Sequence, residues 1–314
     1  MDPNLWFWKN EGQSFLGRLK IWVNTLDPAS LLSSDARIKK AHSILGRGAI
    51  LDQWDEEALI LSLSSVHADS GDVLPLIFRP VGFLTVSSPM IIASLLPHTT
   101  VRHALFWQFF LQSYQTGFTL SNRNSSSEKN KAPSLRQLLL SAGTVSYATC
   151  AGAIPEIISY QLGVNSAPIK TFLRTILPIP LSAAVAFFSV YTIRSEESET
   201  GIQVFDSNGN PVGLSKAAGQ KAVRETALSR AALFGTTAAV PALLLTVLRK
   251  TRVIHRSSLL IALLRCMSVA IGFGLMIPVS FSLFPQLGTI KTEKVEKNLQ
   301  VAAGDGLLYY HRGL

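Results

Sequence analysis

Five apolar stretches, each close to the length of a membrane span, constrain the fold of this 314-residue chain more than any other feature. A helix needs roughly 20 mostly apolar residues to cross a bilayer, where its backbone must be hydrogen-bonded internally. Only 16% of the residues are charged, which is low for a soluble protein. We therefore expect an all-α multi-pass membrane protein with about five transmembrane helices in residues 101–284. The stretches lie at about 101–119, 137–160, 173–193, 227–248 and 257–284.

The parts of the chain outside these stretches differ in character. Residues 1–80 carry more polar and acidic positions, which predicts a soluble, helical N-terminal region. Residues 81–100 are apolar, but Pro80 immediately precedes them, and Pro89 and Pro97 lie within them. Because proline interrupts helices, we expect a re-entrant or interfacial segment there, with a sixth span as the alternative. Residues 285–314 are expected to form a C-terminal tail.

A polar stretch at residues 201–226 separates the third and fourth apolar stretches and carries signals of ordered structure. Asn208 and Gly209 lie between two short apolar runs and suit the positive φ angles of a two-residue hairpin turn. Ser215 is a typical residue to cap the start of a helix. The pattern predicts one β-hairpin followed by a helix, packed against the membrane domain or a partner.

Polar side chains recur along one face of the first apolar stretch. Gln108, Gln112 and Gln115 have helical spacing, and Ser113 lies beside them. Amide groups in hydrocarbon are costly without hydrogen-bond partners. We expect these side chains either to line a cavity that serves as a substrate pathway or to bond to neighbouring helices.

Two arginines fall inside the apolar stretches. Arg230 lies only a few residues into the fourth stretch, so its guanidinium is expected to reach the lipid headgroups. Arg265 lies about eight residues, or roughly 12 Å, into the last stretch. At that depth we expect it to face the bundle interior, where Glu156 is the candidate acidic partner. A position near the headgroups is the alternative.

The sequence lacks the patterns typical of catalytic and metal-binding sites. Cys150 and Cys266 have no Cys or His neighbours, and the histidines lack the spacing of metal ligands. Neither a nucleophile elbow nor a phosphate-binding loop occurs. We expect no enzyme activity, no metal site and no cofactor. The formal net charge of +9 is spread over loops, which favours contact with membrane lipids over nucleic acid.

Several short motifs together resemble the sideroflexin family of the mitochondrial inner membrane. They are Ser14-Phe-Leu-Gly-Arg18, Thr25-Leu-Asp-Pro28, His67-Ala-Asp-Ser-Gly71, Leu105-Phe-Trp-Gln108 with Gln112-Ser113, Asn122-Arg123, Asp206-Ser-Asn-Gly-Asn210 and Leu283-Phe-Pro-Gln286. The resemblance implies about five spans, no cleaved presequence, and transport of small neutral amino acids such as serine. The candidate substrate pathway then comprises His67, Asp69, Ser70, Gln108, Gln112, Ser113, Gln115, Arg265 and Gln286. For the cluster at His67, an ordinary polar turn is the alternative.

The chain departs from the family pattern in two places. The family's His-Pro-Asp-Thr element is His67-Ala-Asp-Ser70 here, and its Asn-Gln-Ser-x-Asn element is Leu111-Gln-Ser-Tyr-Gln115. The second change would reshape a small amino-acid site, which brings serine transport into question. The departures are similar to those of a divergent subgroup associated with respiratory complex I assembly and with iron, iron–sulfur and haem homeostasis. We therefore expect a transporter-like protein that contacts complex I assembly factors. An active small neutral amino-acid transporter is the first alternative, and an iron channel is the last.

Overall fold

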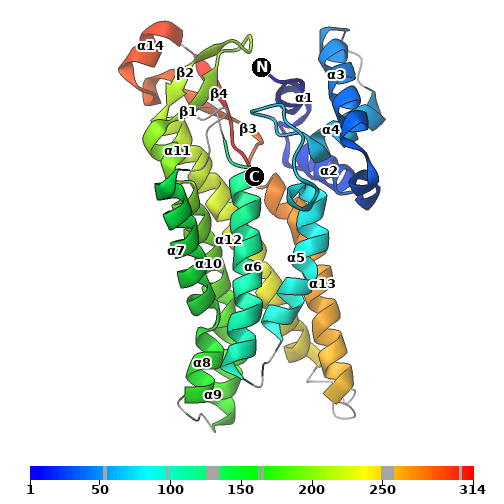
Figure 1. Ribbon diagram of the computed structural model, residues 1–314, viewed down its shortest axis with the longest axis vertical. Helices are drawn as coiled ribbons and strands as arrows, with labels where there is room; N and C mark the ends of the chain where they lie inside the picture. The colour runs from blue at the N-terminus through cyan, green and yellow to red at the C-terminus, as the bar shows by residue number, and fades with distance from the viewer. Residues whose placement is uncertain are drawn as a thin grey trace.

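Long helices form a bundle, and the N-terminal helices and a small sheet lie together at one end of it (Figure 1). The computed structural model describes residues 1–51, 55–96, 98, 100–124, 134–161, 163, 166–248, 258–303 and 306–314. Residue 257, with which the predicted fifth span begins, lies outside the described residues, as does Pro97.

The N-terminal region is helical and packs onto the end of the bundle. Side-chain caps set its helix starts, as where Asp55 accepts the Ala58 N–H at 3.0 Å. One face of the region forms its own small core around Ile38 and Leu45, while Trp22 packs in the main core of the bundle. Its helices are α1 Pro3–Glu11, α2 Phe15–Thr25, α3 Asp35–Leu51 and α4 Glu56–Ser65, with 3-10 turns Pro28–Leu32 and Leu76–Phe78.

The bundle contains helices long and apolar enough to cross a membrane. Three segments qualify by length and composition: Pro168–Ile193, Lys216–Leu244 and Leu260–Ser282. A fourth results if the pair Leu135–Gly152 and Ile154–Gln161, bent by 48°, is one broken span. These segments indicate a multi-pass membrane protein. The bundle helices are α5 Pro80–Leu95, α6 Val101–Ser121, α7 Leu135–Gly152, α8 Ile154–Gln161, α9 Ala167–Thr171, α10 Pro178–Ile193, α12 Lys216–Leu248 and α13 Ser258–Ser282, with a π-helical turn Phe172–Ile176 before α10.

The expectation of five spans is not confirmed. α6 covers the predicted first span, but Arg102, His103 and its glutamines leave it less apolar than the three qualifying segments. α5 runs unbroken through Pro89, whereas we expected that proline to interrupt the chain. Its 16 residues extend over roughly 24 Å, which is less than a hydrocarbon core of about 30 Å. Both helices nevertheless pack lengthwise in the bundle, α5 against α6 and α13.

The predicted hairpin is present, but its loop is longer than expected. Strands β1 Ile202–Phe205 and β2 Pro211–Ser215 pair antiparallel. The two-residue turn is wrong: residues 206–210 form the loop, in which the Asp206 carboxylate accepts the N–H groups of Asn208 and Asn210 at 2.9 and 2.8 Å. Gly209 has the expected positive φ, 81°. Ser215 caps α12 as predicted, accepting the Ala218 N–H at 3.2 Å.

Residues 285–314, where we expected a C-terminal tail, contain regular secondary structure. They contain β3 Leu287–Lys291, α14 Lys297–Ala303 and β4 Leu307–His311, and β4 pairs with both β1 and β3. The result is one antiparallel sheet in the order β2-β1-β4-β3. Leu308 and Tyr310 point to one face of β4, where they pack against Ala218 and Ala222 of α12. Burying that face on α12 accounts for the ordered C-terminal strand.

Candidate functional site

The predicted pathway residues fall into different cavities. Gln108, Gln112 and Gln115 line a cavity inside the bundle, which we name the inner cavity. Gln108 and Arg265 line a second one, the outer cavity. His67 and Gln286 instead line a third, the junction cavity, between the N-terminal region and the bundle. Ser113 lines none of the three.

The inner cavity has an apolar lining with a few polar groups, as is typical of small-molecule sites. Its empty volume is about 670 Å³, open solvent included. The glutamines both face the cavity and bond to neighbours, because Gln115 Nε2 lies 3.5 Å from Ser87 Oγ and Gln112 Nε2 lies 3.4 Å from Gln108 Oε1. The glutamines thus line a cavity and also bond to neighbouring side chains. The polar lining residues are Ser94, Gln108, Gln112, Gln115, Thr119, Ser182, Ser189, Arg230 and Thr237.

The inner and outer cavities adjoin one another. Gln108, Gly152 and Ser182 line both of them. A Cβ atom on Gly152 would lie 2.4 Å from Gln108 Oε1, so only glycine lets this amide approach α7 so closely. A polar group on α6 therefore stands where the two cavities meet.

The outer cavity carries charged side chains at the bent part of the bundle. Glu156 and Arg174 form an ion pair at 3.5 Å. Arg265 lines the same cavity, as expected for a residue facing the interior, and its Nη2 donates to the Arg174 carbonyl at 3.5 Å. Arg174 lies in the π-helical turn, a distortion frequent at functional sites. Interrupted helices and charged side chains thus coincide here.

Arg230 does not reach the headgroups, contrary to expectation. It is 2% exposed, and its guanidinium carbon lies 4.7 Å from the ring centroids of Phe83 and Phe281 and 5.1 Å from that of Phe118. A cation over aromatic faces is stabilised electrostatically. No local sequence pattern indicates this contact, because the rings come from α5, α6 and α13.

His67 organises the turn that follows it. Its Nε2 lies 2.8 Å from the Arg123 carbonyl oxygen, and its Nδ1 lies 3.3 and 3.2 Å from the backbone nitrogens of Asp69 and Ser70. These partners suit a neutral ring with the proton on Nε2. Asp69 and Ser70 thus contact His67 through their backbone, which favours the ordinary turn over a ligand cluster.

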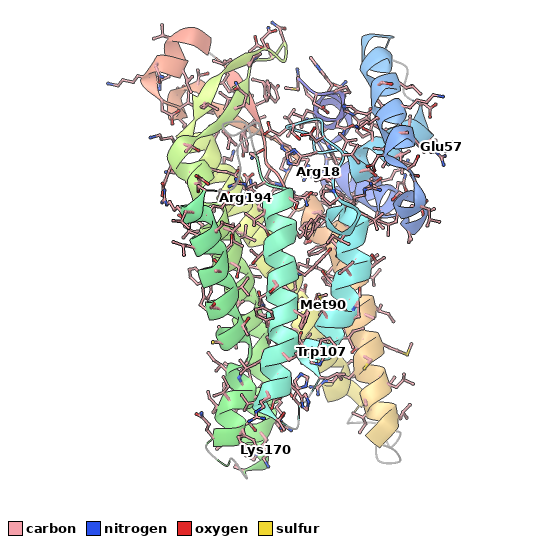
Figure 2. The ribbon with its side chains drawn as sticks, viewed as in Figure 1. Arg18, Glu57, Met90, Trp107, Lys170 and Arg194 are labelled. Atoms are coloured by element: carbon pink, nitrogen blue, oxygen red, sulfur yellow. The ribbon has the colours of Figure 1, made fainter. Side chains whose placement is uncertain are left out.

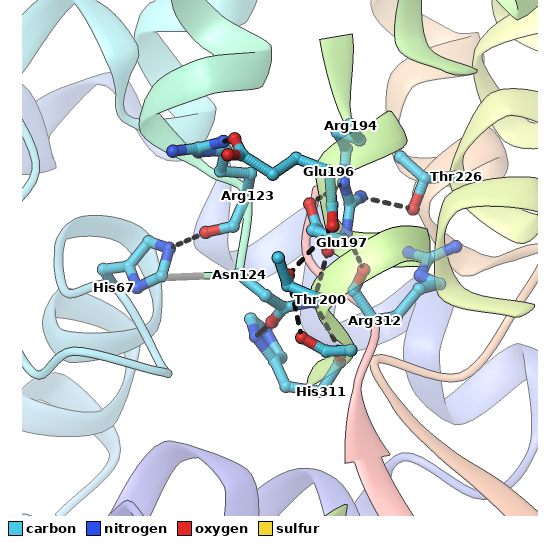
Figure 3. Close-up of polar contacts among 11 residues, drawn as sticks. His67, Arg123, Asn124, Arg194, Glu196, Glu197, Thr200, Thr226, His311 and Arg312 are labelled. Carbon is cyan, nitrogen blue, oxygen red and sulfur yellow. Dashed lines mark hydrogen bonds and ion pairs between the residues drawn. The ribbon is translucent and has the colours of Figure 1, made fainter. Parts of the chain in front are cut away.

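A buried polar cluster next to the junction cavity ties the C-terminal strand to the bundle (Figure 3). Arg194 donates to both carboxylate oxygens of Glu197, at 2.6 and 2.7 Å, and to the Arg312 carbonyl at 2.7 Å. Asn124 donates to Glu197 at 3.0 Å and bonds to His311 Nδ1 at 2.9 Å. Figure 2 shows Arg194 at the sheet end of the bundle, opposite Lys170. No sequence pattern predicts this cluster, because its members come from separate segments of the chain. One of these segments is the short helix α11 Ser195–Thr200.

Two buried histidines give the fold an expected pH dependence. Burial lowers the pKa of His67, which nearby carboxylates only partly offset, and lowers the pKa of His311 further. The unfolded chain protonates both near pH 6.5, so it binds more protons than the folded chain in acid. The contribution of these two histidines to the free energy of unfolding is therefore complete above about pH 6.5, and it is lost as the pH falls below that value. We expect His311→Gln to weaken this dependence of the Tm in detergent.

The exposed His103 provides the control for that prediction. His103 is exposed, and its Nδ1 hydrogen-bonds to Thr100 Oγ1 at 2.9 Å at the start of α6. His103→Gln should leave the fall in Tm between about pH 7 and 5.5 as it is in the unaltered protein. An equal pH dependence in His311→Gln would show that the buried imidazole does not cause it.

No group of three or more His, Cys, Asp or Glu side chains that could hold a metal ion occurs among the described residues.

Comparison with known proteins gives a consistent result over the whole chain. The family model described as Sideroflexins matches residues 4–314. A Danio rerio protein named Sideroflexin-4 is 48% identical over 317 residues, covering 100% of both chains. The Homo sapiens Sideroflexin-4 is 34% identical over 320 residues, covering 100% of this chain and 93% of its own. The Homo sapiens Sideroflexin-5 is 27% identical, covering 96% of this chain and 90% of its own. No solved structure matches the chain.

Proposed function

This chain belongs to the sideroflexin family, and from that premise we propose that it is a transporter-like protein of the mitochondrial inner membrane with a solute site in its inner cavity. The observation that carries the proposal is the stripe of Gln108, Gln112 and Gln115 facing a cavity between apolar helices. Polar groups at such positions are costly and commonly mark solute pathways.

The adjoining outer cavity supports a pathway rather than a closed pocket. It continues from Gln108 to the charged residues Glu156, Arg174 and Arg265. Near these residues the chain bends by 48° between α7 and α8 and forms a π-helical turn before α10. Many transporters build their substrate sites at interrupted helices of this kind.

The residues that differ from the family pattern bear on the substrate. Leu111 and Gln115 stand where the resemblance leads us to expect asparagines, and both line the inner cavity. An apolar side chain and a longer amide reduce the hydrogen-bonding capacity and the space available to a small amino acid. We propose that serine is carried poorly as a consequence. An active serine or small neutral amino-acid transporter is the alternative, and the retained Gln112 is compatible with it.

Uptake of labelled serine into proteoliposomes tests this proposal. We expect the unaltered protein to give uptake close to that of empty vesicles, and Leu111→Asn with Gln115→Asn to raise it severalfold by restoring two small amides. Leu138→Asn with Leu139→Asn, at exposed positions of α7, is the matched control and should not raise uptake. Rapid serine uptake by the unaltered protein would establish the alternative instead.

We further propose that the protein supports respiratory complex I assembly and, through it, iron and iron–sulfur homeostasis. The resemblance to the divergent subgroup motivates this role. Exposed apolar side chains in the N-terminal region, Leu16 of α2 at 73% and Leu32 of the following 3-10 turn at 92%, offer a surface for assembly factors. Complex I amounts in cells lacking the protein provide the test, and unchanged amounts would remove this part of the proposal.

A further inference from the structure

The guanidinium of Arg230 is buried without a full set of hydrogen-bond partners. Arg230 lines the inner cavity, and its Nη1 and Nη2 have no hydrogen-bond partner among the described residues. A guanidinium carries five N–H donors, and buried donors that remain unpaired are costly. The three phenylalanine rings over its face stabilise the charge but accept no conventional hydrogen bond.

The surroundings of Arg230 carry an excess of buried positive charge. Arg194, Arg230 and Arg312 are all at most 2% exposed. Of these, Arg194 forms an ion pair with the buried carboxylate of Glu197. Arg312 donates to the Phe281 carbonyl and to the side chain of Gln286. None of the residues that line the inner cavity in the described ranges is acidic. A buried charge without a counter-charge is strongly unfavourable, so this site favours an anion.

We propose that the inner cavity binds a small monocarboxylate whose carboxylate group pairs with the terminal nitrogens of Arg230. The planar guanidinium fork matches the two oxygens of a carboxylate. The remainder of the ligand lies against apolar lining residues such as Ile193 and Phe234, with Gln112 and Gln115 available to polar substituents. This inference rests on the proposed function, since it names the class of solute for the same cavity.

The charge balance also favours a monocarboxylate over a zwitterionic amino acid. One carboxylate neutralises Arg230, whereas the ammonium group of an amino acid would add a second cation to a lining whose described residues include no acid. Glutamine and serine oxygens can accept hydrogen bonds from an ammonium, but they do not supply a negative charge. The cavity therefore discriminates against the ammonium group.

Calorimetric titration of the full-length protein in detergent, in a carboxylate-free buffer, tests the proposal. Propionate is the probe, propionamide is its neutral isostere, and L-alanine adds the ammonium group to the same carbon skeleton. We expect propionate to bind at least tenfold more tightly than either. Equal binding of propionate and propionamide would overturn the role of charge, and equal binding of L-alanine would overturn the ligand class. Chloride that binds as tightly as propionate would also overturn the carboxylate assignment.

Variants locate the site on Arg230. Arg230→Gln should abolish propionate binding, whereas Arg136→Gln, which removes a surface arginine, should not change it. If Arg230→Gln does not fold, the three-ligand comparison on the unaltered protein still decides the ligand class. Propionate binding that persists in folded Arg230→Gln would refute the assignment. The serine-uptake test does not depend on these titrations, so either result can fail alone.

Discussion

Replacing Glu197 with glutamine is expected to lower the free energy of unfolding by about 3–5 kcal/mol. Glu197 is 4% exposed, and its two oxygens accept from Arg194, which is fully buried. The amide keeps the size of the carboxylate but leaves the Arg194 charge in the interior without a counter-ion. It also places an amide donor near the Asn124 Nδ2 group, which now donates to Glu197 at 3.0 Å. Equilibrium unfolding in detergent measures the effect.

Glu199 supplies a matched control for this prediction. It forms a similar two-point ion pair with Arg136, at 2.6 and 2.7 Å, but both side chains are more than half exposed. Solvent and salt screen such a pair, so Glu199→Gln should leave stability nearly unchanged. Equal losses in the two variants would show that burial does not set the importance of the Arg194–Glu197 pair.

The features that could be predicted from the sequence are those set by neighbouring residues. The hairpin and the Ser215 cap depend on residues within a few positions and are both present, although the loop is 206–210 and not the expected two residues. The glutamine face of α6 follows from helical spacing alone. These local signals identified the hairpin and three of the residues that line the inner cavity.

The features that could not be predicted depend on partners distant in the chain. The strand β4 is stabilised by β1, whose sequence lies about a hundred residues earlier, so residues 307–311 carried no recognisable pairing signal. Arg230 was placed near the headgroups from its position along α12, but aromatic rings on three other helices determine its environment. The first span predicted over α6 is not confirmed, and its polar residues line the inner cavity or contact Ser87 of α5.

Replacing Trp22 with alanine is expected to destabilise the protein by about 3–5 kcal/mol and to loosen the N-terminal region from the bundle. Trp22 is 2% exposed, and its ring centroid lies 5.0 Å from that of Phe281 in α13 and 5.4 Å from that of Trp8 in α1. It therefore joins two N-terminal helices to the bundle. Arg18, one turn earlier, adds a hydrogen bond to the Ser282 carbonyl at 2.9 Å.

Limited proteolysis and thermal unfolding together check where the loss at Trp22 occurs. In Trp22→Ala we expect faster cleavage within residues 1–80 as well as a lower Tm, since the alanine leaves a cavity at the contact between the two parts. Val23→Ala is the control: its side chain is 57% exposed on the same helix, and we expect both measurements to stay unchanged. A lower Tm in Trp22→Ala without faster cleavage would mean that Trp22 stabilises the bundle itself rather than the attachment of the N-terminal region.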